Sequence, residues 1–321
     1  MQFSFLNYKD NRIIAVKVEG GYVDCSRLIP GGANSALAYV ADREAAFLGS
    51  VQWKLDSEHE VIPENEVEYL SPVSEPKKII CIGINYQEHS DEFATNAPEE
   101  PIVFSKFSDT IIPCNDKIIC PDCCQELDYE CELCLIVKDE CYNISVEEAQ
   151  EHILGYTVAN ILNIFFLYIF FHYMFPLLCL HDVSSRDWQL KRNNKQWTVG
   201  KSFPTFCPIG PHFVLSSEFN PLNKKIYTYV NGELRQNSNT SKMIFNPYEL
   251  LAWVSNLFHL ERGDIILTGT PSGVGAFSNP PKFIHDGDTV ICGIEGIGEL
   301  KNEVIKQADV NTNKTGLLTR L

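Results

Sequence analysis

Residues 161–180, ILNIFFLYIFFHYMFPLLCL, form a run of twenty residues without a charge. At about 1.5 Å per residue, a helix of this length would reach roughly 30 Å, the thickness of a bilayer core. Asn163, His172 and Pro176 interrupt the run. A membrane span would also place its two flanks on opposite sides of the bilayer. A membrane anchor and an apolar insertion looped out at the surface are therefore two competing interpretations.

Composition describes a chain that can build a substantial core. Of its 321 residues, 45% are apolar and 21% are charged, which fits one large domain with or without a small one. The formal net charge of -16 repels phosphate backbones, so we expect no nucleic-acid partner. The first twenty residues lack the layout of a secretion signal and are not rich in arginine. We predict an intracellular protein, cytoplasmic or mitochondrial.

Short apolar runs separated by turn residues dominate the chain, with few helical segments. This pattern predicts a β-rich α+β fold and not alternating βαβ units. Turn residues in SPVSEP precede a new apolar strand and indicate a boundary. We predict a small N-terminal domain over 1–72, a larger domain over 73–308 and a polar tail over 309–321.

Two helices carry start signals. Ser145 and Glu148 form a capping-box pair, and Gly155 is expected to end that helix. Asn246 is a plausible N-cap for the second helix, and Gly263 is expected to end it.

Paired carboxylates are the clearest chemical signal. Glu130 and Glu132 lie two apart in DYECELCLIV, which reads as a strand, so both project from one face. Two adjacent like charges are costly unless a cation neutralises them. A solvated strand edge and a metal site both remain open on this pattern. Asp182 is a candidate third ligand, and three carboxylates favour Mg²⁺ or Mn²⁺ over zinc.

Five of the twelve cysteines are clustered, which raises the question of a zinc site: Cys120, Cys123, Cys124, Cys131 and Cys134. Two Cys-x-x-Cys spacings are typical of zinc ligands. On a strand, however, positions three apart point to opposite faces, so the second pair could not chelate together. We expect ordinary thiols and no zinc-binding module.

Several groups could bind a small anionic substrate. Arg186 and Gln189 follow Asp182, and Lys201 comes later in VGKSF. Thr270 lies in the Gly-rich turn of LTGTPSGVG, where backbone N–H groups can hold a carboxylate.

A possible general base lies earlier in the chain. His89 and Glu92 are three apart, which places them on one face of a helical turn. A carboxylate beside an imidazole fixes its tautomer and raises its basicity. An incidental acidic neighbour of a surface histidine is the alternative.

Six segments together resemble the fumarylacetoacetate hydrolase superfamily and occur in that family's order. They are GINYQEHSDEF, PIVFSKFSDTI, DYECELCLIV, HDVSSRDWQ, GKSFPTFCPIGP and LTGTPSGVG, and they run from about residue 75 to 305. The resemblance implies a mixed β-sandwich roll, a homodimer and no membrane partner. It also implies Mg²⁺ or Mn²⁺ on Glu130, Glu132 and Asp182, substrate contacts from Arg186, Gln189, Lys201 and Thr270, and a catalytic His89–Glu92 dyad beside Lys201.

The resemblance further implies a small 2-oxo or β-diketo acid as the substrate and a metal-bound enolate as the common intermediate. Two segments, QWTVGKSFPTFCPIGP and VNGELRQNSNTSKMIF, resemble a branch that favours keto–enol tautomerisation of oxaloacetate. Hydrolysis of a C–C bond in acylpyruvates or fumarylacetoacetate, and decarboxylation of oxaloacetate, are alternatives. Pro204 departs from the family, which usually carries Asp there; Pro removes a backbone donor just after Lys201.

The apolar run also departs from the family. In relatives, GYTVA leads within one residue into DVSSRDWQ, whereas 160–181 intervene here, so 21 residues are additional. Their Ile, Phe, Leu, Tyr and Asn content is what AT-rich non-coding DNA yields when translated, and 21 codons keep the frame. We therefore favour a retained intron over 161–181. An inactive or membrane-tethered derivative is the alternative, because the insertion separates the metal ligands.

Overall fold

The computed structural model describes residues 1–73, 75–92, 96–163 and 197–310. Its strands are β1 (Phe3–Tyr8), β2 (Asn11–Val18), β3 (Gly21–Asp24), β4 (Ile62–Pro63), β5 (Glu68–Leu70), β6 (Ile79–Gly83), β7 (Ile102–Lys106), β8 (Ile111–Ile112), β9 (Lys117–Cys120), β10 (Asp128–Val137), β11 (Ile153–Asn163), β12 (Cys207–Leu215), β13 (Lys225–Val230), β14 (Glu233–Asn239), β15 (Ile265–Leu267), β16 (Thr289–Ile294) and β17 (Gly298–Lys306). Its α-helices are α1 (Ala36–Asp56), α2 (Gln87–Glu92), α3 (Val146–Ala149), α4 (Trp197–Lys201) and α5 (Pro247–Leu257).

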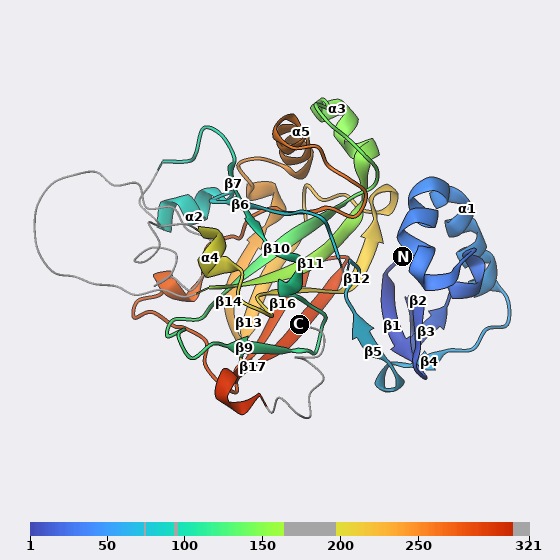
Figure 1. The fold of residues 1–321 in the computed structure, drawn as a ribbon, viewed down its shortest axis with the longest axis horizontal. Coiled ribbons are helices and arrows are strands. Elements are labelled where there is room, and N and C mark those ends of the chain that lie inside the picture. Colours follow the sequence, from blue (N-terminus) through green and yellow to red (C-terminus); the bar gives the residue numbers. More distant parts are fainter. Residues whose placement is uncertain (74, 93–95, 164–196, 311–321) are drawn as a thin grey trace, which may run out of the picture.

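Two mixed sheets organise the described residues. The larger runs β4-β3-β2-β1-β12-β11-β10-β15-β6-β7, with β5 added to β1 and β8 to β12. The smaller runs β14-β13-β16-β17-β9. Most neighbours are antiparallel, but β15–β6, β17–β9 and β12–β8 are parallel. The predicted β-rich α+β class is confirmed (Figure 1).

The N-terminal elements, β1 to β5 and α1, form a lobe beside the larger body (Figure 1). Its strand β1 pairs with β12, where Phe3 lies opposite Phe213, so the larger sheet runs through both parts. A buried polar cluster, here called the seam cluster, lies beside this pairing and consists of Ser4, Tyr22, Tyr69 and His212. Ser4 Oγ and His212 Nδ1 are 2.6 Å apart, and the two tyrosine hydroxyls are 2.8 Å apart. The domain boundary after residue 72 stays a prediction.

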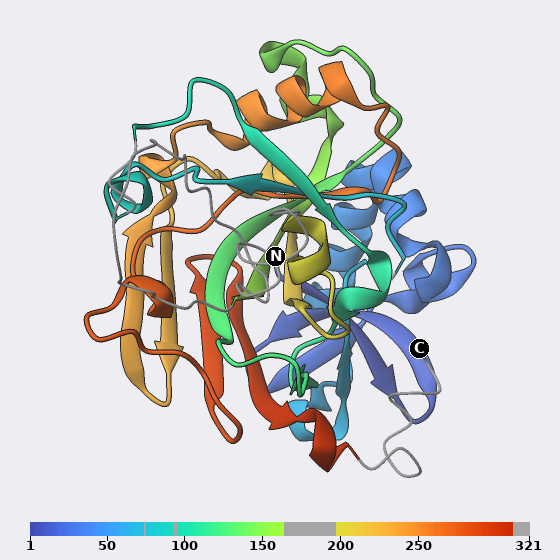
Figure 2. The ribbon, with the colours of Figure 1, turned by 60° about the vertical axis from the view of Figure 1, so that its left-hand side comes forward.

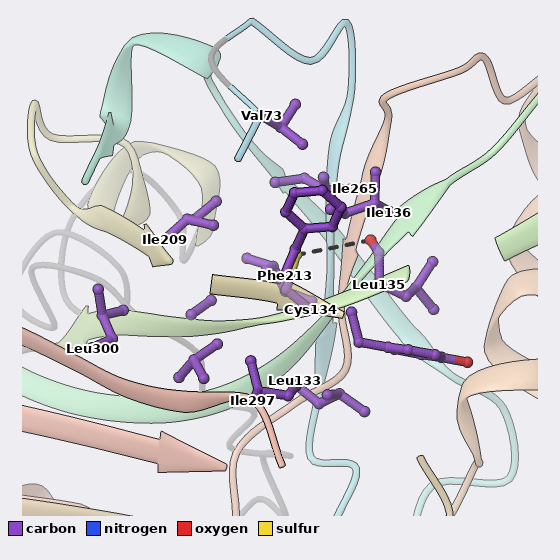
Figure 3. Packing of buried hydrophobic residues seen from close by; sticks show 14 of the residues in the cluster. Val73, Leu133, Cys134, Leu135, Ile136, Ile209, Phe213, Ile265, Ile297 and Leu300 are labelled. Atoms are coloured by element: carbon purple, nitrogen blue, oxygen red, sulfur yellow. Dashed lines mark hydrogen bonds between the residues drawn. The ribbon is translucent and has the colours of Figure 1, made fainter. Parts of the chain in front are cut away.

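Strand β10 occupies the centre of the molecule. All ten of its residues are buried, and it lies between β11 and β15. The orange and red strands of the smaller sheet, β13, β14, β16 and β17, lie over the green strands β10 and β11 (Figure 2). Apolar side chains such as Leu133, Phe213 and Leu300 fill the space around it (Figure 3). The strand is therefore covered on both faces, which excludes the interpretation of a solvated edge.

Both predicted helix starts are confirmed, but both predicted stops are wrong. Ser145 and Asn246 are N-caps that complete capping boxes. Gly155, however, lies in β11, where a Cβ would come within 2.2 Å of the Val214 carbonyl oxygen. Helix α5 ends at Leu257, and Gly263 instead forms the later turn into β15, with a φ of 84°. Tertiary packing requires the glycine at position 155, and turn geometry requires the one at position 263. Both factors outweigh the local helix-stop signal.

The apolar run is only partly described. Strand β11 continues into it as far as Asn163, with Ile161 opposite Glu130 on β10. Residues 164–181 of the predicted insertion lie outside the described residues, so the retained-intron interpretation stays a prediction. In the part of the chain that is described, no helix has the length and apolar character needed to cross a membrane.

Candidate active site

The two predicted carboxylates lie side by side in the core. Glu130 and Glu132 alternate along β10 and therefore project from the same face of the sheet. Each is only 1% exposed. Burial raises the pKa of Glu132 to about 8, and the neighbouring Glu130 carboxylate adds to that increase. This face of β10 thus concentrates negative charge in a region that disfavours it.

Among the described residues, Lys201 brings a basic side chain close to the carboxylate pair. It is the last residue of α4 and is fully buried, with its Nζ 4.0 Å from Glu130 Oε2. The same Nζ lies 4.6 Å from the centre of the Phe104 ring, a cation–π distance. Burial holds the pKa of Lys201 well below its ordinary value, while Glu130 acts in the opposite direction. The predicted Lys201 is therefore brought to the carboxylate pair.

The Gly-rich loop 268–276 runs alongside β10 and forms hydrogen bonds with several of its residues. Gly269 N donates to Glu132 Oε2 at 2.7 Å, and Thr270 Oγ1 donates to the Cys131 carbonyl at 3.0 Å. Gly269 has a φ of 90°, and a Cβ there would come within 2.8 Å of the Asn85 side chain. Further bonds continue the pairing in both directions: Thr268 to Leu133, Tyr129 to Gly273, and Gly275 and Ala276 to Asp128. These hydrogen bonds therefore fix the position of the loop relative to β10, the strand that carries the two carboxylates.

The predicted dyad meets the same loop from the other side. His89 and Glu92 lie on α2, and His89 Nδ1 is 2.9 Å from Glu92 Oε2, so the predicted helical turn is confirmed. The second oxygen, Glu92 Oε1, accepts a bond from Gly273 N at 2.9 Å. Gly273 approaches so closely that a Cβ would lie 2.2 Å from the Arg235 carbonyl oxygen. The loop thus links the dyad to the strand that carries the carboxylates.

Two further polar residues were not identified from the sequence. Lys106, at the end of β7, is buried and its Nζ donates to the Lys201 carbonyl oxygen. Gln236, on β14, donates to Thr270 Oγ1 at 2.8 Å and accepts from Cys131 N at 3.0 Å. Lys106 was visible as a charged residue closing the apolar run of PIVFSK. Gln236 gave no such signal, because its partners are distant in the chain.

Three predicted site residues, Asp182, Arg186 and Gln189, lie outside the described residues. Within 1–73, 75–92, 96–163 and 197–310, no three side chains of the ligating types converge on one point. The described part of the site thus contains two carboxylates of the predicted ligand set, Glu130 and Glu132. A divalent cation fits them, because oxygen ligands suit Mg²⁺ and Mn²⁺ and the cation would offset the repulsion between two buried carboxylates.

Comparison with protein families gives a direct result. Residues 78–162 and 171–305 match the family described as fumarylacetoacetate (FAA) hydrolase C-terminal. The chain belongs to the fumarylacetoacetate hydrolase family. The match is interrupted inside the apolar run. The family resemblance inferred from the six segments is confirmed.

Curated members of the family extend the likeness over most of the chain. The chain is 42% identical over 287 residues to oxaloacetate tautomerase FAHD2B, mitochondrial, of Bos taurus, covering 89% of this chain and 84% of that protein. It is 43% identical over 253 residues to fumarylacetoacetate hydrolase domain-containing protein 2 homolog of Dictyostelium discoideum, covering 76% of each.

Solved structures share the architecture. Fumarylacetoacetate hydrolase of Exiguobacterium antarcticum superposes with a TM-score of 0.75 at 30% identity and covers 96% of this chain and 100% of that one. Maleylpyruvate hydrolase of Sphingobium, solved with manganese(II) and pyruvate, has a TM-score of 0.73 at 22% identity, covers 95% of this chain and 99% of that one, and shows the fold alone.

Proposed function

We propose that this protein is an oxaloacetate tautomerase that holds Mg²⁺ or Mn²⁺ on Glu130, Glu132 and Asp182. The observation that carries the proposal is the pair of carboxylates buried on one face of β10, with Lys201 Nζ 4.0 Å from Glu130 Oε2. Relatives that are about two-fifths identical over most of the chain bear that name. The mitochondrial compartment in those names is proposed for this chain as well.

The proposed reaction moves one proton. The keto form of oxaloacetate loses a proton from the carbon beside its 2-oxo group, and the carbonyl oxygen gains one. A bound divalent cation would supply the positive charge that stabilises the developing negative charge. Each of the remaining tasks falls to side chains of this protein.

His89 is proposed to accept and return the proton, because the contact of its Nδ1 with Glu92 orients the imidazole and raises its basicity. Glu92 itself is held by the backbone of Gly273, so the imidazole is oriented before the substrate arrives. The dyad is therefore assigned the role of general acid and base.

Lys201 is proposed to bind a carboxylate of the substrate, together with Arg186 and Gln189. Lys106 positions Lys201 through the carbonyl of that residue. The Thr270 hydroxyl donates to the Cys131 carbonyl and accepts from Gln236 Nε2, so its remaining lone pair is proposed to accept from the enol hydroxyl of the substrate.

The test follows the ultraviolet absorbance of enol-oxaloacetate as it converts to the keto form. We expect acceleration by the protein, loss of that acceleration in EDTA, and recovery with added Mg²⁺. Release of pyruvate, measured with lactate dehydrogenase and NADH, would instead assign decarboxylation. A metal-independent rate equal to the rate with Mg²⁺ would reject the proposed metal site.

The homodimer and the small 2-oxo acid partner are proposals that rest on family membership. Light scattering after size-exclusion chromatography tests the first. A variant lacking residues 161–181 tests the insertion, because a retained intron predicts activity at least equal to that of the full chain.

A further inference from the structure

Three cysteines of the sequence CPDCC have no role in the proposed reaction. Cys120 is the last residue of β9, and the chain then turns so that Cys124 N donates to the Pro121 carbonyl at 2.8 Å. The turn brings the side chain of Cys124 back toward Cys120. Cys123, between them in sequence, is exposed.

The two sulfur atoms of Cys120 and Cys124 are 3.5 Å apart. A disulfide has a length of about 2.04 Å, so closure requires an approach of roughly 1.5 Å, which lies within reach of a side-chain rotation in a turn. Cys120 is partly exposed, so a small reagent can reach it. The pair therefore satisfies both the distance and the access that thiol–disulfide exchange needs.

Hydrogen bonding favours Cys120 as the attacking thiol. A hydrogen bond from Cys124 lowers the pKa of Cys120, and Lys306 acts in the same direction. Burial, Asp122 and Asp286 oppose this decrease. A thiolate that is partly exposed is the reactive form of cysteine.

The Cys-x-x-Cys pair on β10 provides a contrast. Cys131 and Cys134 are fully buried on β10, and burial raises the pKa of each well above its usual value. They lie three positions apart on a strand and so point to opposite faces. This pair should remain reduced under conditions that oxidise the first.

We propose that Cys120 and Cys124 are an oxidisable dithiol that closes to an intramolecular disulfide by exchange with a low-molecular-weight disulfide of the glutathione class. The Cys120 thiolate attacks one sulfur of the reagent, forming a mixed disulfide and expelling one thiolate. Cys124 then loses its proton to solvent and attacks the Cys120 sulfur, expelling the second thiolate. Two protein thiols are thus oxidised by two electrons, while one reagent disulfide is reduced to two thiols.

The test uses the full-length protein, glutathione disulfide and a chelator, followed by alkylation of the remaining thiols. Cleavage before aspartate at Asp116, Asp122, Asp128 and Asp139 separates Cys120 from Cys124, and separates both from the β10 cysteines. We expect fragments 116–121 and 122–127 to remain joined, and dithiothreitol to release them. Fragment 128–138 should carry two alkylated thiols.

Two serine variants identify the partner. Cys123→Ser should retain the joined fragments. Cys124→Ser should lose them and accumulate glutathione on fragment 116–121, because the attacking thiol remains while the resolving thiol is gone. Separate fragments in the unaltered protein would overturn the proposal. Joined fragments in Cys124→Ser would overturn it too, since they would assign the bridge to Cys123.

Discussion

The molecule buries two polar clusters near the same large sheet, and they are satisfied in different ways. The seam cluster pairs neutral groups, Ser4 with His212 and Tyr22 with Tyr69, and the Tyr69 hydroxyl also donates to the Glu64 carboxylate. The cluster on β10 instead places Glu130 next to Glu132, with Lys201 nearby. Buried neutral groups that bond to one another need no further partner. Two buried carboxylates do need one, which is typical of a site that binds a ligand.

The largest expected effect comes from removing one carboxylate of the β10 cluster. Glu130→Gln should lower kcat/KM for oxaloacetate tautomerisation by about 1000-fold, because it removes a proposed ligand of the cation. Steady-state kinetics at saturating Mg²⁺ provide the measurement. His212→Gln in the seam cluster is the matched control and should stay within about threefold of the unaltered protein. Equal losses of kcat/KM in both variants would show that the two clusters do not differ in their importance for activity.

The seam cluster should respond to pH through His212. Burial lowers the pKa of His212 to about 4, and Lys17 acts in the same direction. The unfolded chain, with a histidine pKa near 6.5, binds this proton more readily, so His212 costs stability as the pH falls from about 6.5 toward 4. The loss should be about 2 kcal/mol between pH 7 and pH 5. Urea unfolding at both values measures it, and parallel pH profiles for the unaltered protein and His212→Gln would contradict the assignment.

The β10 cluster should respond to metal. In EDTA at neutral pH, Glu132→Gln should unfold at a higher temperature than the unaltered protein, since burial raises the pKa of Glu132 to about 8 and the protonation that this imposes on folding costs stability that Gln does not lose. Added Mg²⁺ at 100 times its Kd should stabilise the unaltered protein by about 2.7 kcal/mol and the variant by less. Calorimetry with and without Mg²⁺ gives both the unfolding temperature and the stabilisation by Mg²⁺. If neither Mg²⁺ nor Mn²⁺ stabilises the protein, the proposed cation site is wrong.

The smallest expected effect is a difference in KM between variants of two threonines in the loop 268–276. Thr268→Val and Thr270→Val each remove a hydroxyl that donates to a β10 carbonyl, so each should cost about 1 kcal/mol of stability. Only Thr270→Val should also raise KM, because Thr270 is the proposed substrate contact. Equal KM values would assign both hydroxyls to structure alone.

The sequence predicted those features whose signals are local. Alternation placed Glu130 and Glu132 on one face of a strand, and helical spacing paired His89 with Glu92. The capping motifs also correctly marked where two helices start. In each case the interacting residues lie within a few positions of one another, so pattern and geometry coincide.

Features that depend on distant partners could not be predicted. Gly155 was expected to end a helix, but the close passage of β12 is what requires a glycine there. Gln236 bonds to the backbone of Cys131, 105 positions earlier, and nothing near Gln236 indicates it. The pairing of β1 with β12 is likewise invisible to local patterns, because a strand's own residues do not encode its neighbour.

The attachment of the loop 268–276 to β10 also has a consequence for folding order. Gly269 and Glu132 are 137 positions apart, whereas β10 and β11 are neighbours in the chain. Contacts between distant segments form late, since the entropy of closing a long loop must be overcome first. A refolding chain should therefore pair β10 with β11 before β15 and the loop that follows it reach β10. The recovery of activity should lag behind the recovery of circular dichroism, so a folding intermediate would have β10 and β11 paired but no working site.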